Sequence, residues 1–358
     1  MSEIFKILVV NPGSTSTKLA IFENERQIID KKISHSPSDL AKYATTIEQV
    51  AFRRQAMDDF LKENNIASGA LSAVVGRGGL LKPLPSGTYR VNKHVVEDLT
   101  LSKYGDHASN LGALLANSFT IDYGVPAFIV DPVIVDELQN IARYSGIKEI
   151  NRRSVWHALN AMAVLRQTCS KMNFNINEDN FVVTHIGGGI SVAAIKEGKC
   201  IDVSNGLDGG PFTPERAGTL PTIALVDLCF SGKYTKEEVN KLLVGKGGLV
   251  NYLGTNNIQE VAERYLEGNK EFGEVFEAMA YQIAKEIGSY VAVLKGRVKR
   301  IILTGGGANC STLVDKVSEY IKTFAPVHVV PGEDELSALA LGGLRVLRGE
   351  IPASEYHP

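Results

Sequence analysis

The chain has 358 residues, of which 44% are hydrophobic and 22% are charged, and its formal net charge is −2. This balance argues against a nucleic-acid binder, which would usually be basic, and no apolar run approaches the ~18 residues of a membrane span. The chain is too long for one ordinary core, so we expect two domains. The N-terminus does not resemble a signal peptide and the cysteines are widely scattered (Cys169, Cys200, Cys229 and Cys310), so we expect a cytoplasmic protein.

The first predicted element lies in LVVNPGSTSTKLAIF, residues 8–22. An apolar strand breaks at Pro-Gly, passes through small and hydroxylated residues, and becomes apolar again. One interpretation is a β-hairpin with a slightly long loop. The other is a turn whose backbone N–H groups and hydroxyls hold a phosphate. The local sequence leaves both open.

The remaining predicted elements alternate between helices and strands, which indicates an α/β protein. Helical stretches are predicted within 37–64, at 106–122, at 154–172 with Ser154 as N-cap and crossing between the two halves, at 219–229, at 235–243, at 271–295, from Ser311, and at the end of 327–347. Strands are predicted at 71–79, 126–132, 299–305 and the start of 327–347.

An internal repeat relates the two halves of the chain. Shifted by 174 positions, FVVTHIGGGISVAAIKEGKCIDV (181–203) lies over ILVVNPGSTSTKLAIFENERQII (7–29) without a gap, and Asn11 falls on His185. Both copies read as strand, small-residue turn, strand, polar turn, strand. Chance similarity between two hairpins is the alternative. We favour a duplicated domain, because the two copies stand near the starts of the two halves.

Four small-residue turns follow strands: PGSTST from 12, GGGIS from 187, GGPFTPERAGT from 209 and GGGAN from 305. Each alone is a weak signal, since Gly commonly marks a turn for steric reasons. None has the P-loop lysine spacing, and none completes the dinucleotide fingerprint. Together they suit a phosphate held by backbone N–H groups.

Polar residues stand beside these turns at strand ends. Asn11 and His185 follow strands directly, and Arg77 lies between glycines where a guanidinium could bind phosphate or carboxylate. Asp131 ends a strand and is either a magnesium ligand or a turn residue before Pro132. His157, taken alone, is more typical of a packed histidine than of a catalyst.

The motifs at 8–22, 184–199, 209–221 and 303–309 resemble those of the acetokinase family, in the family's order and over nearly the whole chain. The resemblance implies two duplicated actin-like (ribonuclease H-like) ATPase domains around a central nucleotide cleft. It also implies reversible transfer of a phosphoryl group from ATP to the carboxylate of butyrate, giving butyryl phosphate and ADP, with Mg²⁺. A kinase of isobutyrate, propionate or acetate is the close alternative. An actin- or chaperone-like ATPase and a nucleotide-binding pseudo-enzyme are the distant ones.

The resemblance also assigns site residues by position. Phosphate and nucleotide contacts fall on Ser14, Thr15, Ser16, Lys18, His157, Gly187, Gly188, Gly189, Gly305, Gly306, Gly307 and Asn309. Catalytic positions fall on Asn11, Arg77, Asp131 and His185, and magnesium positions on Asp131 with Asp334 or Glu335. One departure stands out: where acetate kinases have GTR, this chain reads GTL at 218–220. We expect the nearby Arg216 to take the role of the missing arginine.

The expected domains are residues 1–150 plus 335–358 on the acyl-substrate side, and residues 151–334 on the nucleotide side. Acetate kinases tend to have bulky residues at the positions of Gly78, Gly79 and Thr184, so we expect these smaller residues to leave room for a four-carbon acid. The expected partners are ATP and a small carboxylate, with no nucleic acid and no membrane. We also expect a homo-oligomer.

Overall fold

The computed structural model describes residues 3–358, without the side chain of Ser68, and the described chain forms two compact units. The first unit contains residues 3–135 and Asp334–Pro358, and the second contains Asp136–Glu333. Each unit is a mixed sheet with helices on both faces. This confirms the α/β class.

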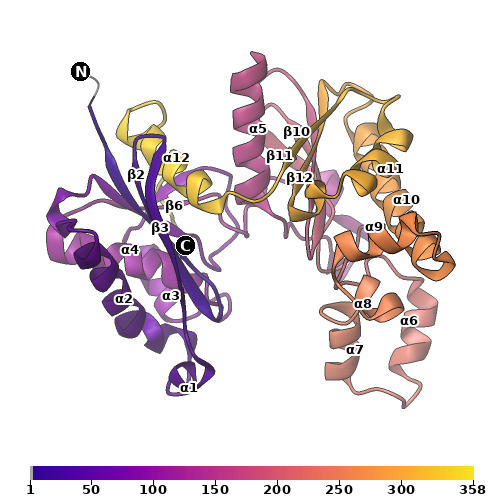
Figure 1. The fold of residues 1–358 in the computed structure, drawn as a ribbon, viewed down its shortest axis with the longest axis horizontal. Coiled ribbons are helices and arrows are strands. Elements are labelled where there is room, and N and C mark those ends of the chain that lie inside the picture. Colours follow the sequence, from indigo (N-terminus) through magenta and orange to yellow (C-terminus); the bar gives the residue numbers. More distant parts are fainter. Residues whose placement is uncertain (1–2) are drawn as a thin grey trace. The chain divides into compact units, whose positions relative to one another are not determined.

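The first unit is built on a six-stranded sheet with the strand order β3-β2-β1-β4-β6-β5. Three of its strands, β2, β3 and β6, are labelled in Figure 1. Its strands are β1 (Lys6–Pro12), β2 (Ser16–Glu23), β3 (Arg26–Ser34), β4 (Ala73–Arg77), β5 (Thr88–Arg90) and β6 (Ala127–Val130). Its helices are α1 (Pro37–Leu40), α2 (Val50–Glu63), α3 (Lys93–Thr100), α4 (Asn110–Tyr123) and α12 (Glu335–Leu347). Gly76 of β4 packs on α4, and its neighbour Val75 packs on α12. The alternation of side chains along β4 therefore assigns the two helices to opposite faces of the sheet.

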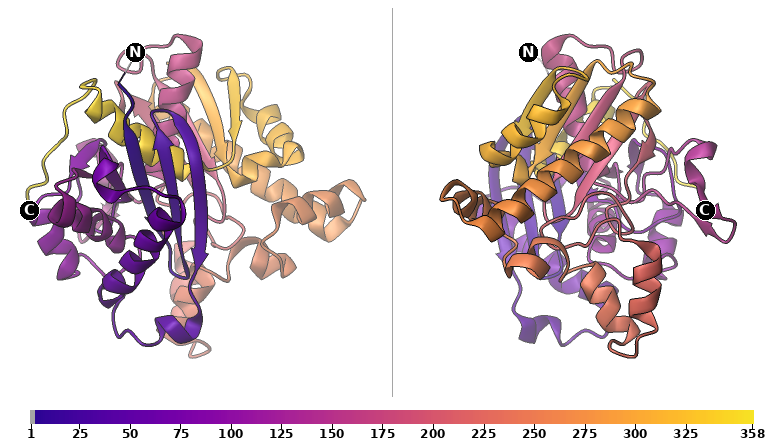
Figure 2. Two further views of the ribbon diagram at one scale, coloured as in Figure 1. Left: turned by 60° about the vertical axis from the view of Figure 1, so that its left-hand side comes forward. Right: turned by 90° about the vertical axis from the view of Figure 1, so that its right-hand side faces the viewer.

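The second unit has a five-stranded sheet with the order β11-β10-β9-β12-β13. Its strands are β9 (Phe181–Ile186), β10 (Ile190–Lys196), β11 (Lys199–Val203), β12 (Arg300–Gly305) and β13 (Val327–Pro331), and a separate small sheet pairs β7 (Tyr144–Ile147) with β8 (Ile150–Asn151). Its helices are α5 (Ala158–Met172), α6 (Thr222–Cys229), α7 (Lys236–Leu243), α8 (Gly248–Leu253), α9 (Ile258–Leu266), α10 (Lys270–Val293) and α11 (Ser311–Ile321). The long helix α10 packs on the sheet and on α11, as the right-hand view of Figure 2 shows.

The two sheets repeat one topology. In each, an antiparallel three-strand meander (β1-β2-β3 or β9-β10-β11) joins a parallel strand, β4 or β12, through its first strand. This confirms the predicted duplication. The two hairpins differ by one residue in register, since Pro12 pairs with Thr17 whereas Ile186 pairs with Ile190. The first turn is therefore one residue longer than the second.

The helix predicted at 154–172 begins later than expected. It starts at Ala158, and His157 rather than Ser154 occupies the N-cap position. It belongs to the second unit, where it packs on β9 and β12, and does not cross between the halves. The stretch 37–64 also divides, into α1, a 3₁₀ turn at Thr46–Gln49 and α2.

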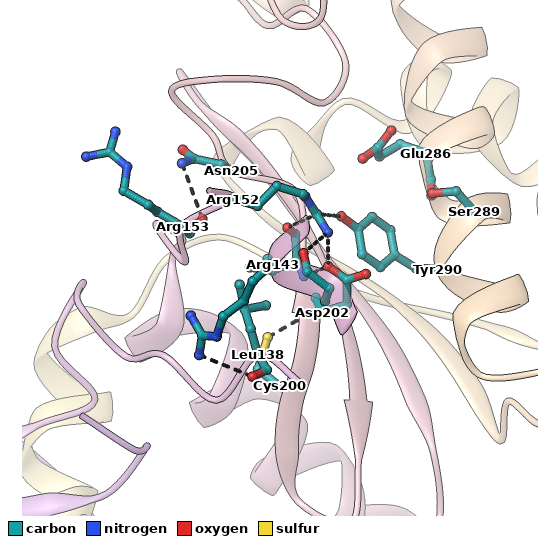
Figure 3. A network of polar contacts seen from close by, with 12 residues as sticks. Leu138, Arg143, Arg152, Arg153, Cys200, Asp202, Asn205, Glu286, Ser289 and Tyr290 are labelled. Carbon is teal, nitrogen blue, oxygen red and sulfur yellow. Dashed lines mark hydrogen bonds and ion pairs between the residues drawn. The ribbon is translucent and has the colours of Figure 1, made fainter. Parts of the chain in front are cut away.

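The boundary between the units lies at 135/136, earlier than the expected 150/151. The connection after Val135 is tied to the second sheet, since the N–H of Gln139 donates to Ile201 and the N–H of Cys200 donates to Glu137. Figure 3 shows Arg152 beside Asp202 of β11, to which it lies 2.9 Å away, and near Tyr290 of α10. The contacts of Glu137 and Gln139 with the second sheet place this connection in the second unit, which begins at Asp136.

Two further findings concern the described residues. No helix in residues 3–358 is long and apolar enough to cross a membrane. All four cysteines are free, and only Cys229 is exposed.

Close backbone approach at Gly112 generates the first prediction. A Cβ at this position of α4 would lie 2.3 Å from the carbonyl oxygen of Arg77. We expect Gly112→Ala to lower the free energy of unfolding by about 2 kcal/mol or more, because α4 and β4 must separate. Gly288→Ala on α10 is the control, since a Cβ there is 3.5 Å from its nearest contact, in Phe324. It should be neutral or stabilising by ~0.5–1 kcal/mol. Urea unfolding of both variants and of the unaltered protein measures these changes. Equal unfolding midpoints for Gly112→Ala and Gly288→Ala would contradict the prediction.

Candidate active site

In the first unit, Asn11 and Arg77 converge on one carboxylate. They end the adjacent parallel strands β1 and β4, where Val9 pairs with Val75, so the two side chains share the face covered by α12. The first residue of α12 is Glu335. Its Oε2 accepts from Asn11 Nδ2 at 2.7 Å, and its Oε1 accepts from Arg77. The structure thus brings together three of the predicted site residues.

The first small-residue turn follows Asn11. Ser14 and Thr15 are exposed and Ser16 is half-buried, while Lys18 is exposed on β2 opposite Asn11. Backbone carbonyl groups of this turn accept hydrogen bonds from Arg53 of α2, which is fully buried. Sequence reasoning missed Arg53, because a single arginine in an amphipathic helix carries no signal of its own.

A cavity of about 220 Å³ lies beside this turn. It is lined by Ser14, Thr46, Gln49, Arg53, Asp106, His107 and Ala108. Burial, then the charge of Arg77, lowers the pKa of His107, and Asp106 opposes this shift. His107 is therefore a second polar residue of this region that the sequence analysis did not single out.

Asp131 is buried at the end of β6, with φ of 36°, in the left-handed region that few side chains adopt. Its Oδ1 accepts from the N–H of Gly87 at 2.7 Å. A buried carboxylate in a strained backbone conformation is common at functional sites. The turn-residue interpretation and the site interpretation both agree with this geometry.

In the second unit, His185 lies at the end of β9 between two acceptors. Its Nδ1 is 2.8 Å from Asn160 Oδ1 and its Nε2 is 3.0 Å from Glu333 Oε1. His185 therefore bridges the side chains of Asn160 and Glu333 within the second unit. The ring of His157 stacks on that of His185 with centroids 3.8 Å apart, and its Nδ1 lies 2.9 Å from Ser191 Oγ.

Glu333 keeps its negative charge at any pH where an enzyme normally works. The hydrogen bond with His185 and the histidine charges lower the pKa of this carboxyl to about 2, against the opposing effect of burial. Gly187 lies against this pair, since a Cβ there would be 3.0 Å from His185 Nε2. A side chain at this position would push into the contact between His185 and Glu333.

Arg216 lies directly on the second small-residue turn. A Cβ at Gly189 would be 2.4 Å from Arg216 Nη1, and that same nitrogen donates to the carbonyl of Gly206 at 2.7 Å. Burial lowers the pKa of Arg216, and the neighbouring Glu215 opposes this shift. The guanidinium thus lies against the second small-residue turn, and its role in place of the missing family arginine stays a prediction.

A cavity of about 310 Å³ joins two of the predicted nucleotide segments. Gly187 and Gly188 of the second turn line it together with Gly306, Gly307 and Asn309 of the turn after β12. The other lining residues include Pro214, Asn256, Ile258 and Cys310. Gly305 has φ of 90° and approaches the backbone of Ile186, so the two turns are in direct contact. Mixed apolar walls and amide groups suit a nucleoside.

The structure corrects the expected acyl pocket. Gly78 and Gly79 are buried, and a Cβ would lie 2.4 Å from Pro132 at the first and 2.7 Å from Asn110 Cα at the second. These glycines permit close packing and leave no open space. Thr184 is fully buried in β9, one residue from His185, so its side chain lies on the opposite face of the sheet. That face carries Val182 and Ile186 in the core beneath α10.

The expected magnesium residues are already engaged within the protein. Glu335 is bound by Asn11 and Arg77, Asp334 Oδ1 caps α12 through the N–H of Ser337, and Asp131 accepts from Gly87. Within residues 3–358 no group of three or more His, Cys, Asp or Glu forms a metal cluster. Mg²⁺ in kinases is commonly held by one or two carboxylates plus substrate phosphates, and oxygen donors of this kind fit that pattern.

Comparisons with known proteins agree with this geometry. A family model described as the acetokinase family matches residues 141–329. Butyrate kinase 2 and butyrate kinase 1 of Clostridium acetobutylicum are each 50% identical to this chain, over 98% and 99% of it and over 99% and 100% of their own length. The crystal structure of Porphyromonas gingivalis acetate kinase is 20% identical and shares the fold over 96% of this chain and 100% of that one, with a TM-score of 0.77. The fold is thus that of the duplicated actin-like ATPases, and the chain belongs to the acetokinase family.

Proposed function

We propose that this protein transfers the terminal phosphoryl group of ATP reversibly to the carboxylate of butyrate, giving butyryl phosphate and ADP. The observation that carries the proposal is 50% identity, over nearly the full length, to two butyrate kinases. The site geometry supports phosphoryl transfer, because in the second unit two glycine turns, the half-buried Arg216 and the His185–Glu333 pair lie at strand ends.

Each unit supplies a distinct set of contacts. In the second unit we assign the nucleoside to the 310 Å³ cavity and phosphate contacts to the 187–189 turn, His185 and Arg216. In the first unit we assign phosphate contacts to the turn 13–16 and contacts with the transferring group to Asn11 and Arg77. His157 orients His185 through ring stacking.

The reaction needs little proton chemistry. A carboxylic acid has a pKa near ~4.3, so the nucleophile is already ionised at neutral pH and no strong base is required. A carboxylate oxygen forms a bond to the γ-phosphorus, the bond from that phosphorus to the bridging oxygen breaks, and ADP leaves. Two anions must meet, so the protein contributes positioning and positive charge.

Mg²⁺ fits the oxygen donors of Asp131 and of Asp334 or Glu335 in the first unit. Bound there with the phosphates, it would neutralise charge on the transferring group. Arg77 and Asn11 hold Glu335 in a fixed orientation, so the carboxylate is preorganised.

The acid specificity is the first test of this function. We expect ATP- and Mg²⁺-dependent formation of acyl phosphate, measured as hydroxamate, with kcat/KM for butyrate about tenfold or more above that for acetate. Two additional buried methylenes are worth ~0.8 kcal/mol each. Propionate and isobutyrate complete the panel, and a preference for one of them would replace the butyrate assignment. If the protein hydrolyses ATP at a rate that no acid of the panel changes, and forms no acyl phosphate, it would be an actin- or chaperone-like ATPase instead.

Arg216 provides the second test. We expect Arg216→Ala to lower kcat by about 10²-fold while the Kd for ADP changes less than about threefold, because its charge acts on the transferring group. The exposed Arg264 of α9, which forms an ion pair with Glu267, is the control as Arg264→Ala and should keep normal kinetics. A near-normal rate for Arg216→Ala would leave the charge neutralisation to Arg77 and His185.

We also propose self-association in solution through α6. This helix has no buried residue, and Ile223, Val226 and the adjoining Phe230 are 75%, 52% and 86% exposed. Sedimentation should give a multiple of the 38.8 kDa chain mass, and Phe230→Glu should reduce it. A single-chain mass for the unaltered protein would reject this proposal.

A cytoplasmic location stays a prediction that cell fractionation can test.

A further inference from the structure

Arg53 of α2 is a fully buried cation whose hydrogen-bond partners are all neutral. All five N–H groups of its guanidinium are used, and the acceptors are the carbonyl oxygens of Gly13, Ser14 and Ser16 and the side chains of Thr17 and Gln49. Burying a charge without an ionic partner is costly. Such a residue is therefore not explained by the stability of α2 alone.

The charge of Arg53 is preserved in spite of burial. Burial lowers its pKa to about 10, which still leaves the guanidinium protonated at neutral pH. The adjacent His35 lies within hydrogen-bond distance of Thr17, and burial followed by the charge of Arg53 lowers its pKa. The region directly behind the first turn is therefore positively charged through Arg53.

The hydrogen bonds of Arg53 set the direction of two peptide groups. The carbonyls of Gly13 and Ser14 point at the guanidinium, at 2.8 and 3.1 Å. In a trans peptide the N–H points away from the carbonyl, so the N–H groups of Ser14 and Thr15 point away from Arg53. Both residues are exposed, and within the described chain neither N–H has a protein acceptor. Two backbone donors are thus presented outward, side by side.

In the second copy of the hairpin, a side chain of another residue type donates a hydrogen bond to a turn carbonyl in the same way. Gly188 is equivalent to Ser14 in the repeat, and its carbonyl accepts from Thr213 Oγ1 at 2.6 Å. In both copies a donor from outside the hairpin therefore holds the carbonyl of the same turn position. Two different side chains, Arg53 and Thr213, thus hold the carbonyl at equivalent positions. This indicates that the orientation of the peptide group is important, whichever side chain fixes it.

We propose that Arg53 is a positioning residue, which locks the peptide groups of the 13–16 turn so that the N–H groups of Ser14 and Thr15 bind a phosphate of the nucleotide. The inference rests on the proposed function, since it names how that function's first phosphate turn is kept in its binding orientation. Without Arg53 the carbonyl oxygens of Gly13 and Ser14 lose this donor, whereas that of Ser16 still accepts from the N–H of Gly13. The two peptide groups that end at Ser14 and Thr15 can then turn toward solvent. The buried positive charge also favours an anion at this turn.

The test compares Arg53→Met and Arg53→Lys with Arg54→Met. Arg54 is the matched control, because it is the next residue of α2 and makes its own strong contacts, to Asp58, to Asp122 and over the Phe119 ring. Both methionine variants remove an arginine and its hydrogen bonds from the same helix. Circular dichroism and thermal unfolding establish that each variant is folded.

We expect Arg53→Met to lower kcat/KM for ATP by about 10²-fold and to weaken ADP binding about tenfold, with KM for butyrate within about twofold of the unaltered enzyme. The kcat/KM for ATP of Arg53→Lys should lie between those of Arg53→Met and the unaltered enzyme, since lysine keeps the charge but lacks the planar, forked guanidinium. Arg54→Met should lower thermal stability and keep normal kinetics. A purely structural role for Arg53 would instead lower stability and leave the nucleotide and acid constants of the folded fraction unchanged.

The inference is overturned if Arg53→Met and Arg54→Met have equal kinetic constants for the nucleotide. It is also overturned if Arg53→Met lowers kcat/KM equally for ATP and for butyrate. If Arg53→Met does not fold, normal ATP kinetics in Arg53→Lys overturn it. Failure of the proposed function looks different. In that case the unaltered protein forms no acyl phosphate from any acid of the panel, and ADP binding to the Arg53 and Arg54 variants still decides the role of Arg53.

Discussion

The carboxylate of Glu335 holds together segments of the first unit that lie far apart in the sequence. It accepts hydrogen bonds from Asn11 at the end of β1 and from Arg77 at the end of β4. Because these strands are parallel and in register, their last side chains reach the same face, and α12 brings its first residue to that point. The return of the chain's end to the first sheet is therefore a condition for the polar cluster, and Asn11 and Arg77 derive their orientation from it.

The second constraint is the direction of backbone carbonyls at the two small-residue turns. A turn binds an anion only if its N–H groups point outward, so its carbonyls must find donors behind it. Arg53 supplies them in the first unit, and Thr213 does so for Gly188 in the second. The two copies thus share the architecture of the hairpin, but a different residue supports the turn in each. The strand registers of the two hairpins also differ by one residue.

Close packing explains the glycines whose purpose the sequence left ambiguous. Gly78, Gly79 and Gly112 allow backbone segments to approach, whereas Gly187 and Gly189 make room for a contact at the site itself. The same residue type therefore serves two purposes in one chain. Chain-length preference for the acid consequently rests on likeness to butyrate kinases and not on an open space at Gly78 or Gly79.

Local pattern alone determined the α/β class, the internal repeat, most elements and the strand-end positions of Asn11, Arg77, Asp131 and His185, because periodicity and turn residues are properties of neighbours in sequence. Family motifs added the nucleotide segments, two of which line one cavity. Only the tertiary structure decided what depends on distant partners. It paired His185 with Glu333, placed Arg216 on Gly189, closed the space at Gly79 and buried Arg53 under the first turn. Such contacts join residues far apart in the sequence, as His185 and Glu333 are, and no local spacing records them.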